Sequence, residues 1–133
     1  MIVDTSAIVA ILQDEKEAHA LDALLLAYPS SMSTPTLVET RIVVNARAGA
    51  SGLRRLDALL RGYGTKVEAF EREHTDIASE AYRDYGRGSG HPAKLNLGDT
   101  FSYALAYARD EPLLYVGDDF SCTDIRSALE EYA

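Results

Sequence analysis

The sequence predicts an α/β fold, a three-layer α/β/α sandwich with a mainly parallel sheet. Short apolar runs typical of buried strands alternate along the chain with longer segments of helical periodicity. Strands that alternate with helices usually form a parallel sheet that the helices cover on both faces. The chain has 133 residues, enough for one domain with its own core. No repeat or low-complexity tract marks a second domain, so residues 1–133 are expected to form a single α/β domain.

The first half of the chain is expected to hold two strands and four helices. Residues 1–4, "MIVD", are a short apolar run, and residues 30–34, "SSMST", are a weaker strand candidate. Helices are predicted over residues 7–13, 15–27, 35–48 and 53–62. Thr5 or Ser6 would cap the first helix, and Gly49 would end the third.

The second half continues the alternation. Residues 65–70, "TKVEAF", alternate in the manner of a strand, and residues 111–117, "EPLLYVG", are predicted to be a buried strand. Helices are predicted over residues 71–86, 98–110 and 124–132. Residues 86–96 hold three glycines and a proline, which predicts a loop. Ligands of parallel sheets bind at the carboxyl ends of the strands, so side chains that follow a strand are the first candidates for chemistry.

Composition limits the possible functions. The net charge of −8 has the wrong sign for direct binding of nucleic acid, because phosphate contacts normally come from a basic surface. A nucleic-acid substrate would need a metal ion or a local cationic patch. Cys122 is the one cysteine, which fits a reducing cytoplasm. No apolar run approaches the roughly 20 residues of a membrane span, and no basic region of a signal peptide is present. We expect a cytoplasmic protein with no membrane association.

Several acids stand where ligand-binding groups are expected. Asp4 follows the first strand, and Asp99 lies at the start of a helix; either can be an N-cap or first-turn acid favoured by the helix dipole. Glu39 shares the apolar stripe of its predicted helix, where burying a carboxylate is costly without a cation. Glu39 can instead pair with Arg41 or Arg47, or lie at the edge of the stripe.

Asp118 and Asp119 follow the last predicted strand. A solvated turn explains at least one of them, since adjacent like charges in one closed site repel. We favour Asp119 for the site, because Phe120 beside it can anchor the turn in the core. Four acids are then expected near one edge of the predicted sheet: Asp4, Glu39, Asp99 and Asp119. Several carboxylates share a small site only with protons or a cation, and oxygen ligands suit Mg²⁺ or Mn²⁺. Scattered histidines and a single cysteine give no zinc motif.

Four segments together resemble a known family. They are "MIVDTSAIVAIL", "ETRIVVNAR", "HPAKLNLGDTFSYALA" and "PLLYVGDDFSCTDI". Their order and spacing resemble the PIN domain, and more narrowly the VapC-type toxins of bacterial toxin–antitoxin pairs, from Met1 to about Asp124. The resemblance implies an α/β/α sandwich and a ribonuclease that depends on Mg²⁺ or Mn²⁺. It also implies a cognate VapB-like antitoxin that blocks the acidic site, and a homodimer or a toxin–antitoxin hetero-oligomer.

The resemblance also assigns roles to residues of this chain. The family's catalytic and metal-binding acids fall, in order, on Asp4, Glu39, Asp99 and Asp119, with Asp118 as the less favoured candidate for the fourth. Small polar residues that often support these acids fall on Thr5, Ser6 and Ser102. Three cations are candidates for contact with the RNA backbone: Arg41, Arg87 and Lys94. Each of them can equally be a solvated surface cation.

Other functions predict different features. A haloacid-dehalogenase-like phosphatase would need a second aspartate two residues after Asp4, where Ser6 stands. A response-regulator receiver would need a phospho-acceptor aspartate at the end of a central strand, and "TKVEAF" offers none. An inactive PIN-like scaffold that only binds a partner protein remains the alternative to a nuclease, and it predicts no effect on toxicity when Asp99 is neutralised.

Overall fold

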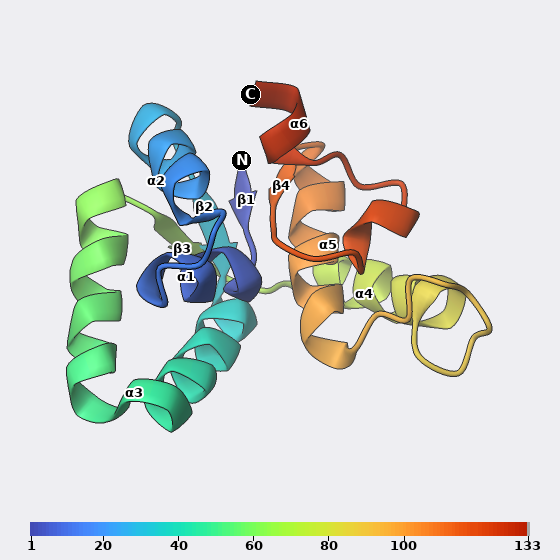
Figure 1. Ribbon diagram of the computed structural model, residues 1–133. Helices are drawn as coiled ribbons and strands as arrows, with labels where there is room; N and C mark the ends of the chain where they lie inside the picture. Colours follow the sequence, from blue (N-terminus) through green and yellow to red (C-terminus); the bar gives the residue numbers. More distant parts are fainter. Residues whose placement is uncertain (133) are drawn as a thin grey trace.

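The computed structural model describes residues 1–132 as one α/β/α sandwich (Figure 1). Its strands are β1 (Ile2–Val3), β2 (Ser31–Ser33), β3 (Lys66–Glu68) and β4 (Leu113–Leu114). Its longer helices are α1 (Thr5–Leu12), α2 (Ala18–Ala27), α3 (Thr34–Tyr63), α4 (Arg72–Tyr85) and α5 (Leu97–Arg109). A 3₁₀ turn, η1 (Phe120–Cys122), and a short helix, α6 (Ala128–Tyr132), follow β4. The predicted fold class is therefore confirmed.

The sheet of residues 1–132 has the order β3-β2-β1-β4, and every pairing in it is parallel. From β1 the chain builds outward through β2 and β3 on one side, and β4 then pairs with β1 on the other side. The strand order thus reverses between β1 and β4, and a ligand crevice opens at such a reversal. The residues that follow β1 and β4, namely Asp4 and the turn at 117–119, leave the sheet at this same edge.

Two hydrophobic cores lie on opposite faces of the sheet, and β1 contributes one residue to each. Val3 packs in the core beneath α1, α2 and α3, whereas Ile2 packs in the core beneath α4 and α5. In β4, Leu114 and Leu113 divide in the same way. This is the alternation of side chains expected along a strand. Figure 1 shows the two groups of helices on either side of the sheet.

Several helix boundaries differ from the sequence prediction. Helix α1 begins at Thr5 with Asp4 as its N-cap, where Thr5 or Ser6 was the expected cap. The helices predicted over 35–48 and 53–62 are joined as α3, which bends at Gly49, where φ is 61° and ψ is −154°. A positive φ suits glycine, so the residue expected to end a helix turns the chain directly into a second helical limb. The helix predicted from residue 15 begins at Ala18, after a turn. The one predicted from residue 124 begins at Ala128, because Ser127 first bridges in parallel to Leu113.

Within residues 1–132, no helix is both long enough and apolar enough to cross a membrane.

Candidate active site

Asp4 is buried at the end of β1, with 4 % of its surface exposed. It is the N-cap of α1: its Oδ2 accepts hydrogen bonds from Ser6 N at 3.0 Å and from Ser6 Oγ at 2.6 Å. Its Oδ1 accepts a hydrogen bond from Ser102 Oγ of α5 at 2.5 Å. Both oxygens are therefore held in place by donors from two different helices, and capping and a functional role are compatible in this geometry.

Glu39 reaches the same edge from the first limb of α3. Its Oε1 accepts a hydrogen bond from Thr5 Oγ1 at 2.5 Å. Its other oxygen lies against the backbone of Gly98, where a Cβ atom would collide with it and would stand 2.6 Å from Glu39 Cδ. Burial raises the pKa of Glu39, and the negative charge of Asp4 raises it further against the lowering effect of the Thr5 hydrogen bond. In residues 1–132 Glu39 forms no ion pair with Arg41 or Arg47.

Asp99 lies in the first turn of α5, where it forms a capping box with Asn96. Asn96 Oδ1 accepts a hydrogen bond from Asp99 N at 2.9 Å, and Asp99 Oδ2 accepts one from Asn96 N at 3.0 Å. Burial raises the pKa of Asp99 to about 7 despite that backbone hydrogen bond, and the charges of Asp4, Asp119 and Glu39 raise it further. The four acids picked from the sequence thus act on one another electrostatically at one place in the fold.

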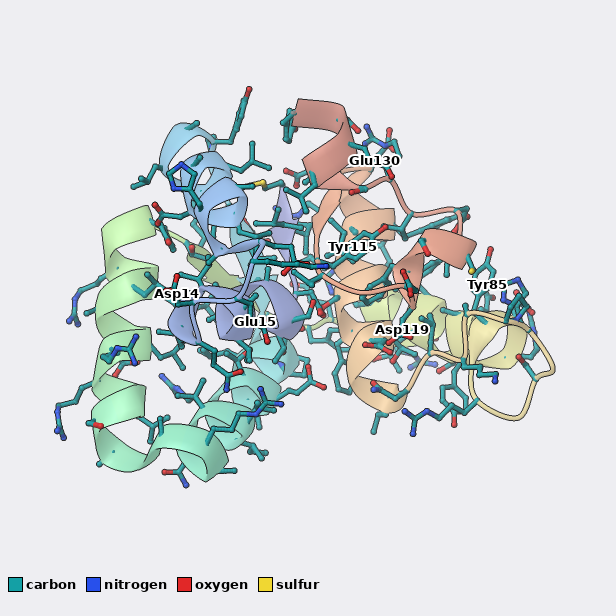
Figure 2. All side chains as sticks on the ribbon, viewed as in Figure 1. Asp14, Glu15, Tyr85, Tyr115, Asp119 and Glu130 are labelled. Atoms are coloured by element: carbon teal, nitrogen blue, oxygen red, sulfur yellow. The ribbon has the colours of Figure 1, made fainter. Side chains whose placement is uncertain are left out.

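Asp118 and Asp119 differ in what their charges reach. Asp119 acts on Asp99, whereas Asp118 acts on Tyr115. Figure 2 shows Asp119 beside α5. Phe120, the next residue, is 2 % exposed and packs in the core beneath α4 and α5, so it anchors this turn as the sequence suggested. The electrostatic effect of Asp119 on Asp99 therefore favours Asp119 over Asp118 as the fourth acid of the site.

The three small polar residues chosen from the sequence each contact an acid or tie the site together. Thr5 donates to Glu39, Ser102 donates to Asp4, and Ser6 donates to Asp4. Ser6 Oγ also accepts a hydrogen bond from Val116 N at 3.1 Å, which links the end of β1 to the segment that follows β4. These hydroxyls orient the carboxylates while leaving room at the open side of the site.

A cavity of about 340 Å³ opens at this edge of the sheet. Its walls include Asp4, Glu39 and Asp99, together with Glu15 and Arg47, which the sequence had not singled out for this site. Figure 2 shows Glu15 in the turn after α1. Arg47 comes from α3, two turns after Glu39, and its Nη1 donates to Gln13 Oε1 at 3.0 Å. The i+8 spacing from Glu39 to Arg47 was the one signal that could have placed this arginine on the same helix face.

The three cations proposed from the sequence lie elsewhere on the surface. Arg41 is exposed, stands 3.9 Å from Asp57, and lines a groove on α3 distinct from the acidic cavity. Arg87 and Lys94 are exposed in the loop between α4 and α5. Lys94 has a left-handed backbone, with φ 50°, just before the Asn96 cap. Arg47 is therefore the arginine that the fold places on the cavity wall.

The donor set fits a hard divalent cation. Carboxylate and hydroxyl oxygens surround the cavity. Burial raises the pKa values of Asp99 and Glu39, nearby acids raise them further, and a cation would favour the ionised carboxylates. Within residues 1–132, however, no three Asp, Glu, His or Cys side chains already stand around a common point as ligands of one ion. The carboxylates would have to turn toward an ion by side-chain rotation.

This combination of a parallel α/β/α sheet and an acid-lined edge defines a family. Residues 1–125 match the PIN domain, and the chain belongs to that family. Within it, Ribonuclease VapC42 of Mycobacterium tuberculosis is 54 % identical over 129 residues, which is 96 % of this chain and 98 % of that protein. Ribonuclease VapC28 of the same species is 47 % identical over 131 residues, 98 % of each chain.

Two solved structures share the fold. VapC20 of M. tuberculosis, described as a toxin that cleaves the sarcin–ricin loop, superposes with a TM-score of 0.72 at 20 % identity, covering 93 % of this chain and 95 % of that one. A chain of a toxin–antitoxin complex from Klebsiella pneumoniae superposes with a TM-score of 0.64 at 18 % identity, covering 90 % and 89 %. At these identities, the two structures establish the architecture alone.

Proposed function

We propose that this protein is a metal-dependent endoribonuclease that acts as the toxin of a toxin–antitoxin pair. The observation that carries the proposal is the position of Asp99, whose pKa is raised to about 7 by burial and by the charges of three other acids. Groups with strongly shifted pKa values in a cleft mark functional sites more often than structural ones. The relatives of 47 % and 54 % identity are named ribonucleases, which gives this acidic site its chemistry.

In the proposed reaction, Asp4, Glu39, Asp99 and Asp119 hold Mg²⁺ or Mn²⁺. When bound, one or two such ions polarise the phosphodiester and make a water molecule a stronger nucleophile at neutral pH. The chain's own contribution is positional. Ser102 and Ser6 fix the two oxygens of Asp4, Thr5 fixes Glu39, and the capping box fixes Asp99. These hydrogen bonds position the carboxylates at the cavity before substrate arrives. A bound cation would favour their ionised forms against the burial that raises the pKa values of Asp99 and Glu39.

The RNA backbone would approach over an acidic surface, so cations at the cavity matter. Arg47 on the cavity wall is placed to contact a phosphate next to the scissile one. Arg41, Arg87 and Lys94 are candidates for more distant phosphates along the strand, from α3 and from the loop before α5. Arginine suits this role, because its planar fork can bind two phosphate oxygens at once.

The proposed protein partner is a VapB-like antitoxin. The open acidic cavity offers carboxylates from the end of β1, from α3 and from α5 to an arginine side chain, and arginine pairs with carboxylates in a bidentate way. An antitoxin segment that inserts an arginine there would exclude both the ion and RNA. A homodimer and a toxin–antitoxin hetero-oligomer are the assemblies predicted for such a protein.

The test is tightly controlled expression of the wild type and of Asp99→Asn, with growth and RNA integrity as readouts. The matched control is Asp76→Asn, which neutralises an exposed acid of α4 that pairs with Arg72. We expect growth arrest and discrete RNA cuts from the wild type and from the control, and neither effect from Asp99→Asn. Purified wild type should cut RNA with Mg²⁺ or Mn²⁺ and stop cutting in EDTA. Equal toxicity of the wild type and Asp99→Asn, or absence of cutting with both ions, contradicts the proposal and favours a partner-binding scaffold.

A further inference from the structure

Two fully buried threonines lie one helical turn apart on the face of α3 that meets the acids. Thr36 and Thr40 are each 0 % exposed. An apolar residue at either position would fill the core equally well and would bury no hydroxyl that requires a hydrogen-bond partner. The presence of threonine at both positions therefore suggests that the hydroxyls have a role. Each hydroxyl contacts another hydroxyl that itself donates to a carboxylate of the site.

The first of these contacts joins Thr40 to Glu39 through Thr5. Thr40 Oγ1 lies 2.9 Å from Thr5 Oγ1, and Thr5 Oγ1 donates to Glu39 Oε1 at 2.5 Å. Thr5 has a single hydroxyl proton, and it goes to Glu39 Oε1 at 2.5 Å and not to the more distant Thr36 carbonyl at 3.5 Å. The close approach of the two hydroxyls is then attractive only if Thr40 donates to Thr5.

Thr40 has one competing acceptor. Its hydroxyl also lies 2.8 Å from the carbonyl oxygen of Thr36. That carbonyl belongs to the helix and already faces the backbone N–H four residues on, so it loses little when the hydroxyl turns away. A hydroxyl that accepts one hydrogen bond donates the next one more strongly, so a Thr40-to-Thr5 bond strengthens the hold on Glu39.

A second set of hydroxyls runs parallel to the first and ends at Asp4. Ser33 Oγ lies 3.0 Å from Thr36 Oγ1, Thr36 Oγ1 lies 3.4 Å from Ser102 Oγ, and Ser102 donates to Asp4 at 2.5 Å. Since Ser102 gives its proton to Asp4, Thr36 is the donor in any hydrogen bond between the Thr36 and Ser102 hydroxyls. The first limb of α3 thus supports both Asp4 and Glu39 from the buried side.

We propose that Thr40 is a positioning residue, which acts through Thr5 to hold the Glu39 carboxylate for a divalent cation. This inference rests on the metal-dependent function proposed above. It differs from a packing role, in which the Thr40 hydroxyl only returns to the Thr36 carbonyl, as buried threonines in helices often do. The two roles predict different effects on metal affinity.

The experiment measures Mn²⁺ affinity of the purified chain from the loss of the electron paramagnetic resonance signal of free Mn²⁺, with no RNA present. Thr40→Val keeps the branched shape and removes the hydroxyl, whereas Thr40→Ser keeps the hydroxyl. We expect Thr40→Val to weaken Mn²⁺ binding about tenfold, the lower end for groups that support a metal ligand, and Thr40→Ser to restore most of it.

The matched control is Thr65→Val. Thr65 is half-buried and its hydroxyl lies 2.9 Å from Ser30 Oγ, at the opposite edge of the sheet, before β2 and β3. This control also removes one hydroxyl from a hydroxyl pair. It should leave Mn²⁺ affinity unchanged, even where its effect on thermal unfolding equals that of Thr40→Val.

A double-mutant cycle with Thr5→Val tests whether Thr40 acts through Thr5. In that case Thr5→Val with Thr40→Val binds Mn²⁺ no more weakly, within about twofold, than Thr5→Val alone. Losses that multiply, or a Thr40→Val protein that binds Mn²⁺ like the wild type, overturn the inference while the metal-dependent function stands. A wild-type protein that binds no Mn²⁺ overturns both the Thr40 inference and the metal-dependent function. This outcome is distinguishable from the others because it is seen with the wild type alone.

Discussion

Gly98→Ala should separate the site from the stability of the fold. Gly98 is the second residue of α5, and the Glu39 carboxylate lies where its Cβ would be. An alanine Cβ would stand 2.6 Å from Glu39 Cδ, and ordinary contact between carbon atoms is about 3.5–4.0 Å. The carboxylate must therefore retreat by about 1 Å or more. Because it is the far end of a flexible side chain, it can do so without moving the backbone.

We expect Gly98→Ala to reduce RNA cleavage much more than it reduces the stability of the fold. Alanine is better than glycine within a helix by up to about 1 kcal/mol. Loss of the Thr5–Glu39 hydrogen bond, whose acceptor is a carboxylate, costs about 1.5–3 kcal/mol in return. The free energy of unfolding should therefore fall by no more than about 2–3 kcal/mol. Misplacement of a catalytic group by 1 Å can lower a rate by roughly 100-fold, and that is the loss of RNA cleavage we expect.

The assay combines urea unfolding with cleavage of RNA and with Mn²⁺ titration. Gly62→Ala is the matched control: Gly62 also lies in a helix, α3, but nothing stands within 4 Å of the Cβ it would acquire. The control should stabilise the fold slightly and cleave RNA like the wild type. If Gly98→Ala cleaves RNA and binds Mn²⁺ like the wild type, the placement of Glu39 over Gly98 is refuted. If Gly98→Ala is strongly destabilised, the Glu39 side chain cannot move aside as we infer.

Three further predictions follow from the site. The pKa of Asp99 is raised from 3.8 to about 7, so in EDTA its contribution to stability is complete below pH 4 and is lost as the pH rises through 7; wild type should lose stability relative to Asp99→Asn over this range in thermal melts, and parallel curves would contradict the shift. Asp119→Asn should lower RNA cleavage by at least about 100-fold and Asp118→Asn by less than about threefold, since Asp119 alone of the two acts on Asp99; the reverse order in initial rates would reassign the fourth acid. Arg47→Gln should weaken RNA binding and reduce the slope of log K against log salt by about 0.7, the value for one phosphate of a single strand, with Arg72→Gln of α4 as the control for an exposed arginine outside the cavity; an unchanged slope would exclude a phosphate contact by Arg47.

The order and type of the elements could be predicted from hydrophobic spacing, because strands two or three residues long still divide their side chains between two cores. Ile2 and Val3 show this most simply. The continuity of α3 could not be predicted, because glycine at a helix end has the same signature whether the chain leaves the helix or bends into another. A positive φ such as the 61° at Gly49 is compatible with a helix end and with a bend into a second helix.

The candidate site was foreseeable in part. Acids that follow strands or open helices can be picked from a sequence, and the fold brings Asp4, Glu39, Asp99 and Asp119 within electrostatic reach of one another. Their role as metal ligands stays a prediction. The contact between Glu39 and Gly98, the hydroxyls behind α3 and the presence of Arg47 on the cavity wall depend on distances between elements, and no local pattern carries those distances.

The pairing of β4 with β1 also sets when the protein can become active during its synthesis. Asp4 is made among the first residues, yet its partner Ser102 follows 98 residues later, and Asp119 later still. At about 5–20 residues per second, a ribosome needs roughly 5 to 20 seconds to cover the first of these intervals. Until α5 is made, the growing chain holds at most two of the four proposed acids, and it lacks the turn after β4. On the function proposed above, a chain that stalls or is released before α5 is made lacks two of the four acids and cannot cleave RNA.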